Sequence, residues 1–474
     1  MTDKISESTT PKYSKSDLHG FLHLLEQHND LLKIDKQVSP KFELAAISRK
    51  LDRKQAVLFE YVEGSGMRVV TNILGTRKRF SLALGTDEPG LIHSHILGSL
   101  TNASHKKTIE DKPLFHDNSS TDLNDLPIVM HFEKDAGHYI TSSIVYAKDQ
   151  EKENQNSSIH RFLRLDRNHM VIRMVEGRHL HKCYSFAKEH GEDLKVTIVV
   201  GVHPAISIAS AYQAAYGFDE MILANSLLKG ELSLSKSDYS GLYVPTYSEI
   251  ILEGRILQDR IAEEWMVEML RTYDIKRQQP VFELDKIRFR NNAFFQDILP
   301  GFSEHRLLMG LPVEAKLYEG VKNVVSSTKT VHLSDGGSNW LTAIIQIHKR
   351  LEGESKNALL AAFANHPSLK MAIIVDDDID PTDPVAIEYA ISTRCQADKG
   401  LLIIPNAKGS SLDPSSDQVN LLTTKLGIDA TISLLKDKER FEIAHIPGED
   451  KIDLSHYVSN KSSHNTSSKE VTIN

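Results

Sequence analysis

The sequence predicts an α/β (α+β) protein of three domains, and three observations lead to this prediction. Apolar runs alternate with helical patterns over residues 13–105, strand patterns dominate residues 115–312, and strands again alternate with helices over residues 315–450. A polar stretch ending at Pro127 separates the first two domains. We therefore expect a small N-terminal α/β domain, a barrel-like central domain with inserted helices, and a C-terminal α/β domain.

The composition is that of a globular protein, with 474 residues of which 40% are hydrophobic and 25% are charged. A net charge of −8 argues against nucleic acid as a partner. No stretch approaches the roughly 18 to 20 apolar residues that cross a bilayer, and two cysteines, Cys183 and Cys395, cannot form a disulfide framework. We expect a cytoplasmic protein without membrane insertion, with a mobile tail at residues 459–474.

Two helices open the N-terminal domain. Apolar residues at helical spacing begin at Leu18, two residues after Ser16, which predicts a capped amphipathic helix. Pro40 opens a second helix, because proline is favoured in the first helical turn. Apolar runs at 56–62 and 68–74 complete the small α/β domain.

The central domain is predicted to contain four strands with apolar or alternating residues, at 139–147, 159–165, 170–175 and 194–200. A helix that ends at Gly191 precedes the last of these strands, and another begins near Pro204. The C-terminal domain shows the rhythm of a mostly parallel sheet, with strands at 342–348, 371–375 and 401–404 and helices at 356–364 and 384–392.

No phosphate-binding P-loop and no glycine-rich dinucleotide fingerprint is present in the sequence, so any chemistry depends on scattered polar groups. Five of them lie on one hairpin and at the start of the next helix: Asn156, Arg161, Arg173, Arg178 and His179. Guanidinium groups and a helix N-terminus both bind anions, which indicates a phosphate or carboxylate site. The alternative is that the arginines only solvate one face of a sheet.

Asn156 and His179, with Glu220 in the first turn of a helix that Asp219 opens, form a mixed ligand set. Amide, imidazole and carboxylate groups suit Mn²⁺ or Mg²⁺ better than structural zinc. Among 22 histidines, chance pairings are common, so a surface or core role for His179 is the alternative.

An acidic stretch carries Glu263 and Glu268, five residues apart with apolar residues between them. In a dry pocket one carboxyl group can donate a proton while its neighbour stays charged. A solvated helix face is the alternative interpretation.

In this order, these positions resemble the UbiD family of prenylated-FMN-dependent decarboxylases, over nearly all of residues 15–447. Further family-like runs are DLHGFL (17–22), TNILGTR (71–77), YVP (243–245) and EIILEG (249–254). The resemblance implies that the central domain is a split β-barrel that binds the flavin. The family's Glu-Gly-Pro-Phe-Gly-Glu/Asp stretch has the spacing of Glu263 and Glu268, but Glu264 stands in place of its first glycine and is a rival for the role of Glu263.

Site roles follow from this resemblance. Arg161, Glu263 and Glu268 are implied as the catalytic set: Arg161 orients the substrate carboxylate, Glu268 delivers the proton that replaces CO₂, and Glu263 tunes both. Asn156, His179 and Glu220 are implied as ligands of Mn²⁺ or Mg²⁺ at the flavin phosphate, with K⁺ as a further cation. The implied cofactor-binding residues are Ile159, His160, Arg161, Arg173, Met174, Val175, Arg178, His179 and Lys425.

Several stretches are similar to the archaeal branch of the family: KDAG (134–137), RHLH (178–181), GVHPA (201–205), DGGSNW (335–340) and KGSSLDPSSD (408–417). This similarity implies a small phosphorylated unsaturated acid as substrate, with trans-anhydromevalonate 5-phosphate losing CO₂ to give isopentenyl phosphate in a mevalonate pathway. It also implies a homo-oligomer and a flavin prenyltransferase that supplies the cofactor.

Three alternatives remain at this point. The chain can be a UbiD-type decarboxylase of an aromatic acid such as 4-hydroxy-3-polyprenylbenzoate. It can be a flavin reductase that binds ordinary FMN in its strand-rich middle domain. It can also be a flavin-binding or assembly protein without catalysis, if Glu263 and Glu268 are solvated and distant from the flavin.

Overall fold

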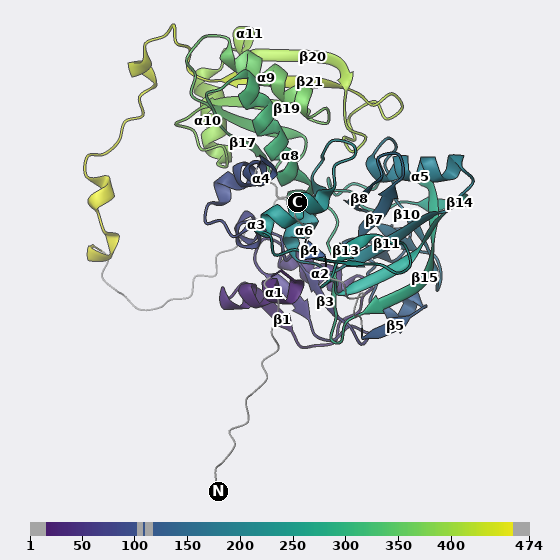
Figure 1. The fold of residues 1–474 in the computed structure, drawn as a ribbon. Helices are drawn as coiled ribbons and strands as arrows, with labels where there is room; N and C mark the ends of the chain where they lie inside the picture. Colours follow the sequence, from purple (N-terminus) through teal and green to yellow (C-terminus); the bar gives the residue numbers. More distant parts are fainter. Residues whose placement is uncertain (1–15, 102–107, 110–116, 458–474) are drawn as a thin grey trace. The chain divides into compact units, whose positions relative to one another are not determined.

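The computed structural model describes residues 16–101, 108–109 and 117–457 (Figure 1). The chain up to Thr431 forms one compact unit, and residues from Ile432 onward form a second. The described part of the second unit contains only short 3₁₀ helices: η3 (Lys438–Phe441), η4 (Glu449–Lys451) and η5 (Leu454–His456). No helix among the described residues is both long and apolar enough to span a membrane.

The N-terminal region carries a four-stranded sheet in the order β1-β2-β3-β16, with strands β1 (Leu31–Ile34), β2 (Ala56–Phe59), β3 (Arg68–Thr71) and β16 (Phe294–Gln296). Its helices are α1 (Leu18–Gln27), α2 (Glu43–Lys50), α3 (Arg77–Leu84), η1 (Pro89–Leu91) and α4 (Ile92–Thr101). Both predicted helices are present. Helix α1 is capped by Asp17, whose carboxylate accepts from the Gly20 amide at 2.7 Å, rather than by Ser16.

A nine-stranded sheet forms the centre of the molecule, and every strand pairing in it is antiparallel. Its strands are β5 (Asn118–Ser120), β6 (Tyr139–Ile140), β7 (Ile144–Asp149), β8 (Asn154–Ile159), β9 (Phe162–Arg164), β10 (His169–Ile172), β11 (Leu194–Val200), β14 (Ile250–Glu264) and β15 (Arg277–Phe289). Two predicted strands are divided: 139–147 breaks between β6 and β7, and 159–165 breaks between β8 and β9. The second break contains His160 and Arg161, so neither residue belongs to a strand.

A small sheet combines β4 (Thr108–Ile109), β12 (Ser233–Lys236) and β13 (Tyr243–Pro245). The helices found between residues 118 and 324 are η2 (Leu123–Asp125), α5 (His179–Glu189), α6 (Pro204–Ala211), α7 (Glu220–Leu227) and α8 (Ser303–Val324). Helices α5 and α6 agree with the predicted ones, and Asp219 caps α7 by accepting from the Met221 amide at 2.9 Å.

The C-terminal sheet has the order β17-β18-β19-β21-β20, with β17 (Thr328–Leu333), β18 (Thr342–Ile347), β19 (Met371–Asp376), β20 (Leu401–Lys408) and β21 (Leu422–Ala430). Its helices are α9 (Glu354–Asn365), α10 (Pro384–Arg394) and α11 (Ala397–Gly400). The three predicted strands and two predicted helices are present. The sheet is not mostly parallel as predicted, because its two edge strands, β17 and β20, pair in antiparallel fashion. Strands β17 and β21 were not predicted, because polar residues interrupt their apolar patterns.

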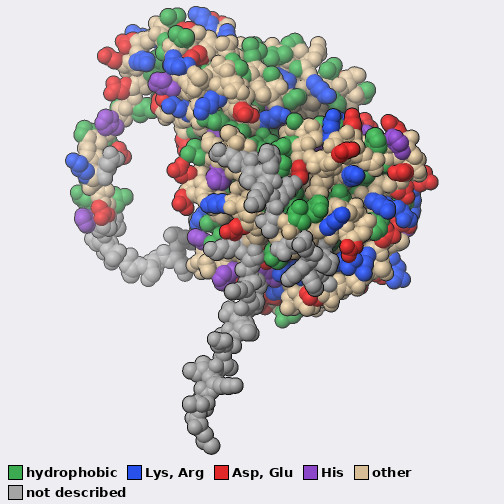
Figure 2. Space-filling view, viewed as in Figure 1, with side chains coloured by type: hydrophobic (Ala, Val, Ile, Leu, Met, Phe, Trp, Pro, Cys, Tyr) green, Lys and Arg blue, Asp and Glu red, His purple; other side chains and the backbone are tan. Residues whose placement is uncertain are grey.

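The compact unit ends at Thr431, and the described residues beyond it form no strand and bury few side chains. The boundary of the third domain at residue 450 stays a prediction. The predicted tail at 459–474 lies outside the described residues. On the face shown in Figure 2, acidic and basic side chains of the described residues are interspersed.

Candidate active site

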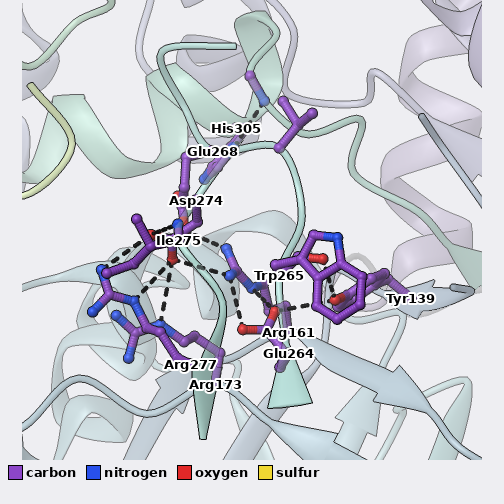
Figure 3. A network of polar contacts seen from close by, with 12 residues as sticks. Tyr139, Arg161, Arg173, Glu264, Trp265, Glu268, Asp274, Ile275, Arg277 and His305 are labelled. Carbon is purple, nitrogen blue, oxygen red and sulfur yellow. Dashed lines mark hydrogen bonds and ion pairs between the residues drawn. The ribbon is translucent and has the colours of Figure 1, made fainter. Parts of the chain in front are cut away.

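Arg161 lies at the centre of a network of charged side chains (Figure 3). Its guanidinium donates to Glu264 through Nε at 2.6 Å and through Nη2 at 3.0 Å, which makes a two-point ion pair. Nη1 donates to Glu268, and Nη2 also reaches Asp274 at 3.3 Å. Most of the donors of this buried guanidinium are therefore held by three carboxylates.

Glu264, rather than Glu263, is the first carboxylate of this set. Glu264 is the last residue of β14 and is fully buried, whereas Glu263 is exposed. Successive side chains of a strand point to opposite faces, so only one of the two neighbours can face Arg161. The structure thus corrects the partner predicted from the family spacing. Glu268 lies in the loop after β14, so the alternative interpretation of this acidic stretch as a solvated helix face does not apply.

Tyr139 supports Glu264 from the opposite side to Arg161. Its hydroxyl lies 3.2 Å from Glu264 Oε1 and 2.8 Å from the carbonyl oxygen of Trp265. Burial, and then the charge of Glu264, raise the pKa of Tyr139 above its usual range. Tyr139 therefore stays a hydrogen-bond donor and helps to fix the orientation of Glu264.

Asp274 is a further carboxylate of the network that the sequence did not single out. Its oxygens accept from Arg277 at 3.0 and 3.2 Å and from the Ile275 amide at 2.9 Å, and Arg173 lies 3.8 Å away. Burial opposes ionisation, but the Arg277 hydrogen bond and the charge of Arg161 lower the pKa of Asp274. Asp274 thus links three arginines.

His305, in the first turn of α8, lies beside Glu268 (Figure 3). Its Nδ1 accepts from the Gly301 amide at 3.1 Å. Burial lowers the pKa of His305 to about 4, although Glu268 opposes the shift. The imidazole is therefore neutral near pH 7 and adds no positive charge at Glu268. No sequence pattern marked His305 or Asp274.

The three predicted metal ligands come together from three separate elements. Asn156 lies on β8, His179 is the first residue of α5, and Glu220 is the first residue of α7. The Asn156 amide nitrogen lies 3.1 Å from Glu220 Oε1 and 3.4 Å from His179 Nδ1, which is 3.8 Å from Glu220 Oε1.

The chemistry of this donor set fits a hard divalent cation. Glu220 is only 2% exposed, and no Lys or Arg among the described residues forms an ion pair with it. Asn156 offers a carbonyl oxygen if its amide is rotated, because the oxygen and nitrogen of an amide exchange places by a flip. The described residues hold no group of three or more His, Cys, Asp and Glu side chains suited to a metal, so Asn156 is needed to complete this one.

The other predicted cofactor residues form a continuous surface next to Arg161. The Arg173 amide donates to the Arg161 carbonyl at 3.1 Å, and His160 Nδ1 lies 2.8 Å from the Arg173 carbonyl. Ile159 ends β8, while Met174 is buried and Val175 is half exposed. Residues 159–161 and 173–175 therefore lie side by side.

Two predicted cofactor residues have other surroundings. Arg178 is exposed, and its Nη1 donates to Gln213 at 3.3 Å. The Lys425 ammonium group donates to the carbonyls of Pro367 and Leu369, at 2.7 Å each. Burial lowers the pKa of Lys425 to about 8. Within the described part of the chain, no hydrogen bond or ion pair joins Lys425 to the metal-ligand set, so its role stays a prediction.

Three family models match consecutive parts of the chain. Residues 22–95, 104–303 and 306–430 match the N-terminal, Rift-related and C-terminal domains of 3-octaprenyl-4-hydroxybenzoate carboxy-lyase. Together they cover most of the sequence. The chain belongs to the UbiD family. This finding confirms the resemblance inferred from the sequence.

Relatives in the UbiD family extend over most of the chain. An anhydromevalonate phosphate decarboxylase of Methanocaldococcus jannaschii is 43% identical over 416 residues, which is 87% of this chain and 97% of the relative. A protein of the same name from Methanosarcina mazei is 39% identical over 433 residues, or 90% of this chain and 99% of the relative.

Solved UbiD structures share the fold. HmfF from Pelotomaculum thermopropionicum, in complex with FMN, has a TM-score of 0.89 and 35% identity, and the alignment covers 93% of this chain and all of that one (100%). A chain with so high a TM-score over the whole length has the same architecture. The mixed α/β fold class predicted from the sequence is therefore confirmed.

Proposed function

We propose that this chain is a non-oxidative carboxy-lyase that converts trans-anhydromevalonate 5-phosphate into isopentenyl phosphate and CO₂. Archaeal anhydromevalonate phosphate decarboxylases 36 to 43% identical over most of the chain support this substrate. The observation that carries the proposal is the buried Arg161, bound on one side by Glu264 and on the other by Glu268.

The cofactor of the proposed reaction is prenylated FMN with Mn²⁺ or Mg²⁺. UbiD-class structures in complex with FMN and with prenylated FMN support the flavin. Asn156, His179 and Glu220 would hold the metal at the flavin phosphate, and residues 159–161 and 173–175 would line the flavin. When bound, prenylated FMN supplies the electron sink that loss of CO₂ from an alkenyl carbon requires. A flavin prenyltransferase would supply the prenylated FMN. The chain would act as a homo-oligomer.

Arg161 binds the carboxylate of the substrate in this proposal. Its guanidinium is fixed in place by the two-point contact with Glu264, while its contact with Glu268 is a single one. A substrate carboxylate can therefore compete with Glu268 for Nη1 without displacing Arg161. Asp274 and Tyr139 keep the network rigid, which orients the carboxylate before reaction.

Glu268 donates the proton that takes the place of CO₂. Once the substrate carboxylate takes the place of Glu268 at Nη1, Glu268 loses its ion pair with Arg161 and lies beside the neutral imidazole of His305. After CO₂ has left, Glu268 is the acid next to the reacting carbon. Glu264 keeps its two-point contact with Arg161 throughout.

The proposed function is tested with protein purified from cells that co-express a flavin prenyltransferase. We expect CO₂ release from trans-anhydromevalonate 5-phosphate, with isopentenyl phosphate as the product. Release from 4-hydroxy-3-polyprenylbenzoate alone would reject this substrate in favour of an aromatic one. Oxidation of NAD(P)H without CO₂ release would instead identify a flavin reductase.

A further inference from the structure

Arg306, on α8, is a buried arginine whose charge has no partner. It is 6% exposed, and its Nε is buried without a hydrogen bond. None of the described residues forms an ion pair or a side-chain hydrogen bond with its guanidinium group. Arginine is rarely buried to this extent unless it is paired, because the loss of hydration of the charge is costly. The arrangement is therefore incomplete without an anion.

The charged groups around Arg306 do not neutralise its positive charge. Burial, followed by the positive charges of Arg53 and Arg271, lowers the pKa of Arg306. Two carboxylates oppose this effect, but both have closer partners. Asp52 accepts from the Ser303 amide and hydroxyl, each at 3.1 Å, and Asp335 accepts from Arg53 at 2.8 Å.

Arg306 lies on the same helix turn as a neighbour of the proposed proton donor. It follows His305 in α8, and His305 lies beside Glu268 (Figure 3). The unpaired arginine is therefore one residue along α8 from a side chain of the active site.

Arg271 approaches the same place from the loop after β14. A Cβ atom on Gly301 would meet Arg271 Cγ at 2.7 Å and the Glu268 carbonyl oxygen at 2.9 Å, so only glycine allows this loop to pack against the start of α8. The Arg271 guanidinium lies 5.7 Å from the centre of the Phe302 ring. Arg271 has no ion pair among the described residues. Like Arg306, it is therefore an arginine without a carboxylate partner, and its side chain packs against Gly301 just before α8.

We propose that Arg306 and Arg271 bind the phosphate of the substrate, at the end remote from its carboxyl group. This inference rests on the proposed function, because it requires a phosphorylated acid whose carboxylate lies at Arg161. In trans-anhydromevalonate 5-phosphate, about six bonds separate the carboxyl carbon from phosphorus, a span of roughly 7 Å when extended. A phosphate dianion would pair with both guanidinium groups.

The test compares two substrates that differ only at this end: trans-anhydromevalonate 5-phosphate and trans-anhydromevalonate, which carries a hydroxyl group there. Arg306→Gln should raise KM for the phosphorylated acid roughly 10- to 100-fold and leave KM for the other unchanged. Arg306→Lys should restore part of the loss. Arg271→Gln should act in the same direction, and its exposed side chain makes misfolding a poor explanation for the result.

Arg167→Gln provides the control for loss of one positive charge, because Arg167 is 77% exposed on a distant hairpin turn. Its kinetic constants should match the wild type. Equal effects of Arg306→Gln and Arg271→Gln on both substrates, or no effect on either, would overturn the proposal.

A second readout separates this proposal from the proposed function. Inorganic phosphate should bind the wild-type protein, measured by calorimetry, and bind Arg306→Gln at least tenfold more weakly. If the wild type releases CO₂ from neither acid, the proposed function fails, yet phosphate binding still decides whether Arg306 forms an anion site. Equal phosphate binding by both proteins would refute the site even if the decarboxylation is confirmed.

Discussion

Glu264 forms a two-point ion pair with Arg161; the Glu264 side chain is fully buried and that of Arg161 is 11% exposed. The pair joins the end of β14 to the break between β8 and β9, two segments that are more than a hundred residues apart in the sequence. Because Arg161 is anchored on this side, its remaining donors face Glu268 and Asp274.

The two adjacent glutamates provide a matched pair of variants. Glu264→Gln removes the charge that fixes Arg161, so we expect kcat to fall roughly 100-fold through loss of orientation. Glu263→Gln alters an exposed side chain and should change kcat less than about twofold. The comparison is made by measuring the rate of CO₂ release by each purified variant. The reverse order of effects would restore Glu263 as the catalytic partner.

Glu268→Gln keeps the shape of the side chain but cannot donate a proton. We expect turnover to fall by roughly 10² to 10⁴, the range typical of general acid catalysis. The flavin should remain bound, because Glu268 is not among the proposed cofactor contacts. Absorbance of the purified variant reports the flavin, and CO₂ release reports turnover. Wild-type activity in this variant would exclude Glu268 as the acid.

Much of the site could be predicted from the sequence, and the exceptions have physical reasons. Asn156, His179 and Glu220 were marked by their residue types, and the structure brings them within hydrogen-bonding range. The choice between adjacent glutamates was not predictable, since it depends on the side of β14 that faces Arg161.

Asp274 and Arg306 show a second limit of sequence reasoning. Asp274 acquires its role from arginines on other strands, and Arg306 is unusual only because it is buried without a partner. Neither property leaves a local pattern. In the fold, likewise, strands with continuous apolar residues were predicted, whereas β17 and β21, with mixed patterns, were missed.

Glu220→Gln should weaken metal binding, because it removes the only carboxylate of the proposed ligand set while retaining an acceptor for the Ser157 amide. We expect loss of Mn²⁺ or Mg²⁺ and reduced retention of flavin after gel filtration. Elemental analysis measures the metal content of the purified protein, and absorbance measures its flavin content. Glu192→Gln, at an exposed position, is the control and should retain both. Full metal content in the Glu220 variant would exclude this site.

The pH dependence of stability should depend on His203. Burial lowers the pKa of its ring to about 4, whereas the ordinary value is 6.5. Between these two pH values the unfolded state binds more protons than the folded state, so the free energy of unfolding rises with pH. As pH falls from 6.5 to 4, the neutral buried ring therefore lowers the free energy of unfolding by about 3 kcal/mol. His203→Asn can still cap α6 but cannot titrate.

We therefore expect denaturant unfolding of His203→Asn to be less sensitive to pH in this window than that of the wild type. His456→Asn changes an exposed ring and serves as the control. Identical pH profiles for His203→Asn and the wild type would show that His203 does not carry this dependence.

Asp274→Asn tests whether the network must be electrically balanced. Three arginines, Arg161, Arg173 and Arg277, lie within 4 Å of the Asp274 carboxylate. Removing its charge leaves them to repel one another, and Arg161 should then bind the substrate carboxylate in a less defined position. We expect kcat to fall roughly tenfold to 100-fold, because small displacements of a positioning group are costly.

Asp259→Asn, which changes an exposed side chain on β14, is the control and should leave kcat unchanged. An Asp274→Asn variant with wild-type kcat would show that Glu264 alone positions Arg161.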